Sequence, residues 1–200
     1  MAARLFFVFT ALLFNCIPAN SQPGYTDSIN TFQANYKKDL YSIIKKDTAF
    51  VKFYSVDESY RVVAAVEKVY GQSFFPMATT DGKTKQAIKY AIVKFILQDK
   101  EYALPVYQLS TLLGSTEYKD NFFLPFTDAL SGISSYGGGK YIDFKTGDIS
   151  SGNELVIDFN KSYNPYCAFR TGYSCPIPPK ENDLPVEVNA GEMNFDKKSH

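Results

Sequence analysis

The sequence predicts a mainly β protein: an antiparallel β-sandwich or barrel with one N-terminal helix and a loop-rich C-terminal half. Three observations predict this class. One long helical pattern is confined to residues 27–46, and about eight short strand-like runs separated by turn residues follow from residue 50. Beyond Asn121 the chain is dense in Gly, Pro, Asn and Tyr, which favours turns over long strands.

The expected helix, Asp27–Lys46, carries one apolar stripe. Its apolar residues recur at steps of three and four: Ile29, Phe32, Tyr36, Leu40, Ile43 and Ile44. Asp27 or Ser28 can cap the start of the helix, and Lys45 and Lys46 complement the dipole at its end. We expect this stripe to pack against the sheet rather than to bind a partner.

The strand-like runs are rich in β-branched residues or alternate with period two. They span residues 60–69, 84–97, 101–109, 122–126, 140–144, 154–159 and 184–188. The pair Asp81-Gly82 predicts a turn ahead of the second run. The polar turn Gln98-Asp99-Lys100 predicts a hairpin over residues 88–109.

Alternation along the runs 140–144 and 154–159 places polar residues opposite the core-facing ones. If these two runs pair through the loop 146–153, one face carries Asp143, Asp158 and Asn160. Such oxygen-bearing groups can hold a sugar, an amine or a hard cation. A solvated sheet face gives the same pattern, so both interpretations stay open.

Residues 1–21 have the pattern of a secretory signal peptide, with Arg4, an apolar run at 5–14, and small residues at Ala19 and Ser21. We therefore expect an exported protein, periplasmic or secreted, whose single domain spans residues 22–200 without a transmembrane segment. The alternative is a lipoprotein acylated on Cys16. It is disfavoured because Asn15 stands where a lipobox carries a small residue.

The composition excludes several kinds of function. The 21 basic residues balance the 21 acidic ones, which leaves no basic field for nucleic acid. The only histidine is His200, the last residue, so the fold has none for a Ser-His-Asp triad, a Cys-His dyad or a His-ligated metal. We predict no cofactor and no bound metal.

Two short patterns have simple structural interpretations. Cys167 and Cys175 lie in a turn-rich loop, where an oxidising compartment favours a disulfide over a thiolate metal site. The run Gly137–Lys140 departs from a phosphate loop because Tyr141 replaces the Ser or Thr and a strand-like run follows. We interpret that run as a turn that allows close approach of the backbone.

Seven motifs follow one another in the C-terminal half: Phe126-Thr127-Asp128, Tyr136–Asp143, Asp158-Phe159-Asn160, Tyr163–Ala168, Cys175–Pro179, Glu181-Asn182 and Ala190-Gly191-Glu192. In this order they resemble the bacterial family of domain of unknown function 1684, closely over about residues 120–192 and loosely from residue 50. The resemblance implies an exported bacterial protein and brings no activity with it. Lys140 stands where the family usually carries arginine, and Leu130 where it tends to carry threonine.

The motifs supply a candidate ligand-binding set: Asp128, Tyr136, Lys140, Asp143, Asp158, Asn160, Asn164, Glu181, Asn182 and Glu192. For Asn164 and Asn182, hydrogen bonding to buried backbone groups is the favoured role.

Two functions follow from these residues. The first is a non-catalytic ligand-binding or envelope-associated module, whose partner is an unknown small molecule or an envelope component. The alternative is a hydrolase or lyase that acts on cell-envelope or carbohydrate substrates with carboxylates alone. Its candidate acids are Asp128, Asp143, Asp158, Glu181 and Glu192. The missing histidine favours the binding module.

Overall fold

The computed structural model describes residues 24–196. The predicted signal peptide, Cys16 and His200 lie outside the described residues. Two helices are α1 (Tyr25–Ile44) and the short α2 (Ser110–Leu113). The strands are β1 (Arg61–Lys68), β2 (Phe75–Ala78), β3 (Thr84–Leu97), β4 (Lys100–Leu109), β5 (Asn121–Asp128), β6 (Lys140–Lys145), β7 (Glu154–Asp158) and β8 (Asp183–Leu184).

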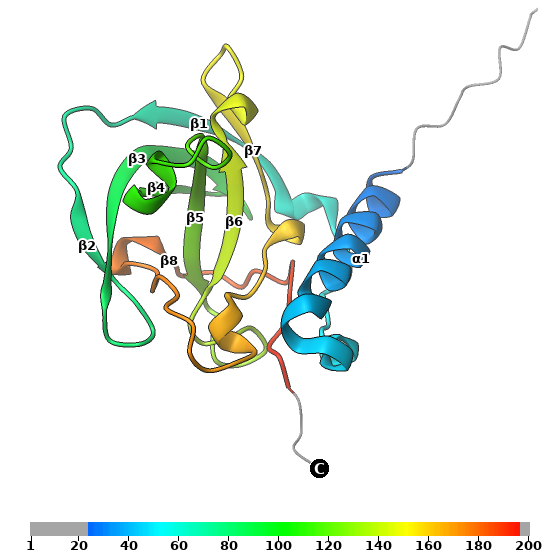
Figure 1. Ribbon diagram of the computed structural model, residues 1–200. Coiled ribbons are helices and arrows are strands. Elements are labelled where there is room, and N and C mark those ends of the chain that lie inside the picture. The colour runs from blue at the N-terminus through cyan, green and yellow to red at the C-terminus, as the bar shows by residue number, and fades with distance from the viewer. Residues whose placement is uncertain (1–23, 197–200) are drawn as a thin grey trace, which may run out of the picture.

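The strands form one curved sheet of eight strands that nearly closes into a barrel (Figure 1). Its order is β6-β5-β4-β3-β1-β7, with antiparallel neighbours; β2 also pairs with β3, and β8 runs parallel to β5. The predicted mainly antiparallel β class is confirmed. Of the two predicted forms, sandwich and barrel, the sheet is barrel-like. The hairpin of β3 and β4 is also confirmed, with its turn at Gln98 and Asp99.

The predicted pairing between residues 140–144 and 154–159 is wrong. Strand β6 pairs with β5, and β7 pairs with β1, where Arg61 lies opposite Asp158. The two strands are the opposite ends of the sheet, so the loop between them crosses the gap between the two barrel edges. We call this gap the seam. At one point it is closed, because Tyr141 and Tyr163 exchange backbone hydrogen bonds of 2.9 and 3.0 Å.

The alternation along these strands is nevertheless confirmed. Ile142 and Phe144 of β6, and Leu155 and Ile157 of β7, are buried in the main hydrophobic core, as is Phe159 just beyond β7. Neighbouring side chains on β6 point the other way, because successive residues of a strand face opposite sides. This places Asp143 outside the core.

Helix α1 lies along the seam side of the barrel (Figure 1). Its predicted apolar stripe is confirmed at Ile29, Leu40 and Ile44, which are buried. The expected packing on the sheet is wrong for the second half of the helix, because Leu40 and Ile44 pack with Val51 in a cluster of their own outside the strands. Two tyrosine hydroxyls fasten the helix: Tyr25 donates to Asp158 at 2.9 Å and Tyr36 donates to Glu192 at 3.0 Å. Neither helix in residues 24–196 is both long and apolar enough to cross a membrane.

Candidate functional site

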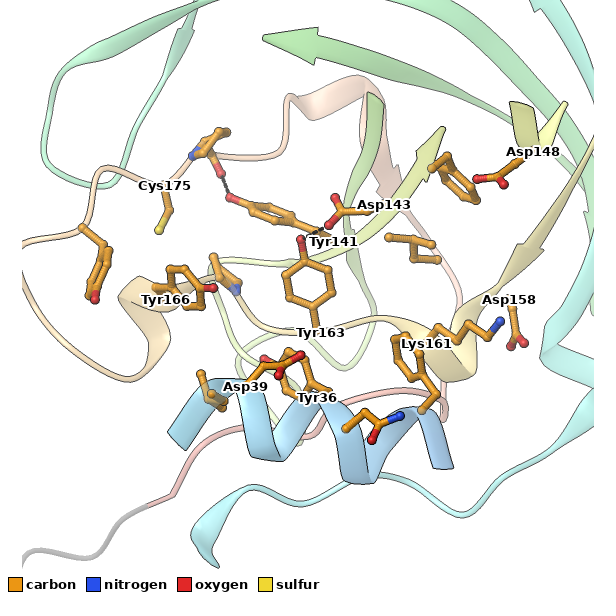
Figure 2. Close-up of a pocket in the computed structure, with 18 of the residues that line it drawn as sticks. Tyr36, Asp39, Tyr141, Asp143, Asp148, Asp158, Lys161, Tyr163, Tyr166 and Cys175 are labelled. Carbon is orange, nitrogen blue, oxygen red and sulfur yellow. Dashed lines mark hydrogen bonds between the residues drawn. The ribbon is translucent and has the colours of Figure 1, made fainter. Parts of the chain in front are cut away.

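A pocket of about 1100 Å³ lies at the seam, between the edge strands and helix α1 (Figure 2). Most of its lining comes from α1, β6, β7 and the loop at 163–176, and Arg61 of β1 and Lys85 of β3 also line it. The pocket exists because β6 and β7 do not pair, and α1 covers the space that remains between them.

Asp143 is the central polar group of this pocket. Its position on β6 turns it away from the core, and its side chain is exposed to the pocket. Oδ2 of Asp143 accepts a hydrogen bond of 2.6 Å from the hydroxyl of Tyr163. The surrounding protein raises the pKa of Asp143 by desolvation, although the Tyr163 hydrogen bond opposes this rise. Burial and the nearby carboxylate together raise the pKa of Tyr163.

Tyrosine rings form much of the remaining wall. The Tyr163 ring lies between those of Tyr36 and Tyr141, with centroid distances of 5.7 and 6.0 Å. The hydroxyls of these three rings already donate within the protein, that of Tyr141 to the carbonyl of Pro176 and that of Tyr36 to Glu192. The rings therefore offer the pocket their faces and edges rather than free donors.

Asp158 also lines the pocket, but its bonding is structural. The residue is only 5 % exposed, and Oδ1 accepts from the Tyr25 hydroxyl and from the backbone and side-chain amides of Asn160, at 2.9 to 3.1 Å. Asn160 is buried too. Its side-chain Oδ1 accepts from the backbone N–H of Asp57, and its Nδ2 donates to the carbonyl of Asp57. Asp158 and Asn160 thus hold the start of α1 and the chain ahead of β1.

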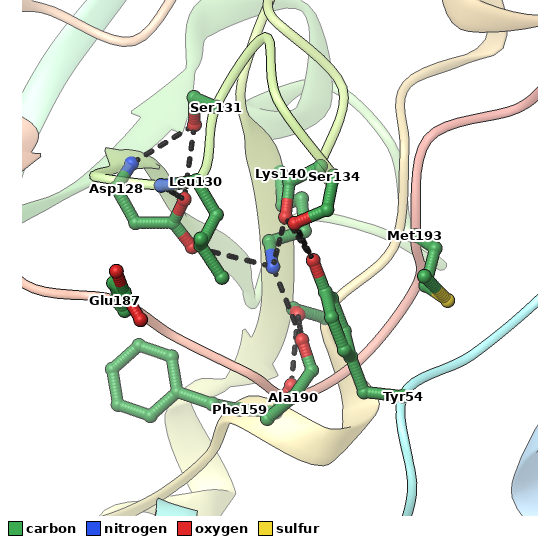
Figure 3. A network of polar contacts seen from close by, with 12 residues as sticks. Tyr54, Asp128, Leu130, Ser131, Ser134, Lys140, Phe159, Glu187, Ala190 and Met193 are labelled. Carbon is green, nitrogen blue, oxygen red and sulfur yellow. Dashed lines mark hydrogen bonds and ion pairs between the residues drawn. The ribbon is translucent and has the colours of Figure 1, made fainter.

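Asp128 and Lys140 form a buried ion pair instead of a ligand site (Figure 3). The two charged atoms lie 3.4 Å apart, with side chains at most 1 % exposed. Nζ of Lys140 also donates to the carbonyl of Ala190 at 3.1 Å, and Asp128 accepts from the backbone of Leu130 at 2.9 Å. Desolvation lowers the pKa of Lys140, and the Asp128 carboxylate opposes this. The carboxylate partner of Lys140 therefore belongs to the chain itself.

The glycine run before Lys140 is a tight turn, as the sequence predicts. Gly139 has φ of +85°, and a Cβ there would lie 2.6 Å from the carbonyl oxygen of Phe126. Only glycine fits this approach, because both the backbone angle and the space exclude a side chain.

Glu192 and Asn164 form a second buried polar group beside α1. Oε2 of Glu192 accepts from the backbone N–H of Asn164 at 2.8 Å and from the Tyr36 hydroxyl at 3.0 Å. Desolvation raises the pKa of Glu192 to about 7. Oε1 of Glu192 and Oδ1 of Asn164 are both buried acceptors without a donor in the structure. The raised pKa favours a proton on Glu192, and a protonated carboxyl adds one hydrogen-bond donor to this group of acceptors.

Glu181 and Asn182 surround the hydroxyl of Tyr107, which lies 2.7 Å from Oε1 of Glu181 and 3.0 Å from Oδ1 of Asn182. Partial burial acts to raise the pKa of Glu181, but the hydrogen bonds from Lys89 and Tyr107 outweigh it and leave this pKa lowered. Asn182 donates to the carbonyl of Pro105, and Asn164 to that of Met193, both at 2.8 Å. The backbone-bonding role expected for the two asparagines is confirmed.

The predicted disulfide is absent, since Cys167 and Cys175 are both free thiols. The loop is held by other contacts. The backbone N–H of Thr80 donates to the carbonyl of Cys175 at 2.9 Å, and the N–H of Cys167 donates to Sγ of Cys175 at 3.4 Å. The hydroxyl of Tyr136 lies 3.6 Å from Sγ of Cys167, and desolvation raises the pKa of Tyr136 to about 12.

Of the ten residues in the candidate set, the pocket brings together Asp143 and Asp158, and the other eight lie outside it. Five further charged residues, which no sequence motif indicated, complete the lining: Asp39, Arg61, Lys85, Asp148 and Lys161. For Asp39 a signal existed, because it follows Tyr36 at a three-residue step on the same helix face. Across residues 24–196, no group of three or more acidic, Cys or His side chains is arranged to hold a metal ion.

Comparison with known proteins identifies the family. No curated protein matches the chain. A solution NMR structure of an uncharacterised protein from Haloarcula marismortui is similar, with a TM-score of 0.63 and 28% identity, over 84% of this chain and 94% of that one. The model of the family described as "Protein of unknown function (DUF1684)" matches residues 47–193. The match spans most of the chain, which therefore belongs to this family.

Proposed function

We propose that the protein is an exported, non-catalytic binding protein that takes a small molecule in the seam pocket. The observation that carries the proposal is Asp143: a carboxylate exposed within a pocket of about 1100 Å³ and bonded by a tyrosine of the pocket wall. Charged groups that are buried away from the pocket have a structural role, as in the ion pair of Asp128 and Lys140. The pattern of residues 1–21 supports export.

The positions of the five candidate catalytic acids favour binding over catalysis. Asp128 and Glu192 are buried outside the pocket, and Glu181 is bonded to Lys89 on another face. Asp158 is buried and accepts hydrogen bonds from the chain. Asp143 is thus the one member of this group that is both in the pocket and exposed.

One observation favours a second candidate function, a carboxylate-dependent hydrolase or lyase. Desolvation raises the pKa of Asp143, and a general acid needs a shift in this direction. Release of product from envelope glycans or other carbohydrates, lost in Asp143→Asn, would support this function over simple binding.

The test is a thermal-shift screen of sugars, muropeptides, lipids, amines and anions on the exported protein. A pocket ligand raises the melting temperature of the wild type, because binding to the native state stabilises it. The variant Asn35→Trp places a large ring on the pocket side of α1 and should abolish the shift, since Asn35 lines the pocket. Asn30→Trp on the same helix is the matched control, since Asn30 is exposed and outside the lining.

The results decide between clear alternatives. Stabilisation that survives in Asn30→Trp and is lost in Asn35→Trp supports the pocket. Stabilisation that both variants retain, or a screen in which no class stabilises the wild type, overturns the proposal.

A further inference from the structure

The middle of the seam pocket holds two carboxylates, Asp39 from α1 and Asp143 from β6 (Figure 2). Both side chains are exposed to the pocket. Among residues 24–196, the four ion pairs with Lys or Arg involve neither of them. Desolvation raises the pKa of Asp143, and the hydrogen bond from Tyr163 lowers it. Tyr163 is uncharged at neutral pH, so it does not neutralise the carboxylate.

The basic residues of the lining lie towards the two ends of the pocket. Lys161 lies beside Asp158 in Figure 2, with its Nζ 5.7 Å from the centre of the Phe32 ring. Arg61 is opposite Asp158 in the register of β1 and β7. Lys85 is at the far end, near enough to the Cys175 thiol to act on its pKa. Negative charge is therefore concentrated in the middle.

The same central region is lined by aromatic rings. Tyr36 and Tyr163 pack with centroids 5.7 Å apart, and Tyr166 is 45 % exposed beside them. Desolvation and Tyr173 raise the pKa of Tyr166, and Asp143 and Asp39 add to this rise. Tyr166 is thus within electrostatic range of both carboxylates, and rings and acids share one volume.

Resting on the proposed function, we propose that the pocket takes an organic cation, an amine or a quaternary ammonium compound. Its charged group is attracted by the carboxylates of Asp39 and Asp143, and its apolar groups lie against the surrounding tyrosine rings. The negative face of an aromatic ring attracts a cation, and a desolvated site strengthens this attraction. An anion would meet two carboxylates there. A polyol would meet tyrosine hydroxyls that already donate to protein acceptors.

The experiment is an NMR titration of the exported protein with matched probes. Choline and benzylamine are the cations, and 3,3-dimethylbutanol and benzyl alcohol are their neutral counterparts of similar shape. We expect each cation to bind at least about fivefold more tightly than its counterpart, with shifts at the pocket residues. Asp39→Asn should weaken binding of the cations by at least about fivefold, and Asp120→Asn, an exposed acid outside the pocket, should leave it unchanged.

The outcomes separate this inference from the proposed function. Equal binding of charged and neutral probes, or no effect of Asp39→Asn, overturns the cation inference and leaves a binding pocket. The same holds if no cationic probe binds while the thermal-shift screen finds a neutral or anionic ligand that Asn35→Trp excludes. Failure of every compound in both experiments overturns both proposals.

Discussion

The hydroxyl of Tyr36 donates to Oε2 of Glu192 across 3.0 Å, which joins helix α1 to the C-terminal segment through a buried carboxyl group. Tyr36 also contributes its ring to the seam pocket. The helix that covers the pocket is therefore held by a group whose pKa, about 7, lies near physiological pH.

Burial of the Glu192 carboxyl makes stability depend on pH, because desolvation raises its pKa although the hydrogen bond from Tyr36 opposes the rise. The pKa of Glu192 rises from 4.5 in the unfolded chain to about 7 in the fold. A raised folded-state pKa contributes stability that is fully present below pH 4.5 and is lost as pH rises through about 7. We expect the difference between pH 4.5 and 8 to reach about 3 kcal/mol. Urea unfolding at these pH values measures it.

The variant Glu192→Gln isolates this effect, because an amide mimics the protonated acid and does not titrate. It should lose that part of the pH dependence, whereas Glu187→Gln, at an exposed position nearby in sequence, should keep it. Identical pH profiles for wild type and Glu192→Gln would contradict the assignment.

The buried pair of Asp128 and Lys140 predicts a large cost for removing one partner. Lys140→Met leaves the Asp128 carboxylate buried without its cation, so we expect a loss of about 3–5 kcal/mol in the free energy of unfolding. The double variant Lys140→Met/Asp128→Leu should lose much less than the two single changes added together. Additive losses in chemical denaturation would show that the two charges do not interact.

Any side chain at Gly191 should destabilise the fold, because the backbone of another segment lies very close to this residue. Its φ is +75°, and a Cβ would lie 2.6 Å from the carbonyl oxygens of both Phe159 and Ser162. Gly191→Ala should therefore lose at least about 2 kcal/mol. Gly71→Ala is the matched control, because Gly71 has φ of +69° with open space around it. Equal melting temperatures for the two variants would mean that the backbone angle alone sets the cost.

Removing the hydroxyl of Tyr107 should lower the stability of the fold, because it leaves the buried Oδ1 of Asn182 without this donor. Tyr107→Phe removes the donor to Asn182, whose side chain is fully buried, and should cost about 1–2 kcal/mol in thermal or urea unfolding. It should also raise the pKa of Glu181 towards its ordinary value, as an NMR pH titration can show. Tyr102→Phe tests the removal of a hydroxyl from a ring that packs on Phe95. Similar losses from both variants would argue against the bond.

Local patterns predicted much of the fold because they depend on near neighbours in the chain. The apolar stripe of α1 was readable from its spacing, with Leu40 and Ile44 buried as expected. The turn at Gln98 and Asp99 predicted the hairpin of β3 and β4, since a short turn sets the register on both sides. The alternation along β6 correctly predicted that Asp143 points away from the core.

Contacts between distant segments could not be read in this way. Asp143 and Asp158 were expected on two paired strands, yet they reach one pocket because β6 and β7 end the sheet on opposite sides of an unpaired gap. Lys140 was expected to meet a ligand, and its carboxylate partner is Asp128 on the neighbouring strand β5.

The amino-acid order by itself determined the helix, most of the strands and the faces that turn inward, because hydrophobic periodicity acts over a few residues. The short strand β2 lies outside the predicted runs. Only the tertiary structure decided which strand edges stay unpaired, where α1 lies, and so which side chains share the pocket. The physical reason is that barrel closure depends on pairings between residues far apart in the chain, and no local pattern encodes those pairings.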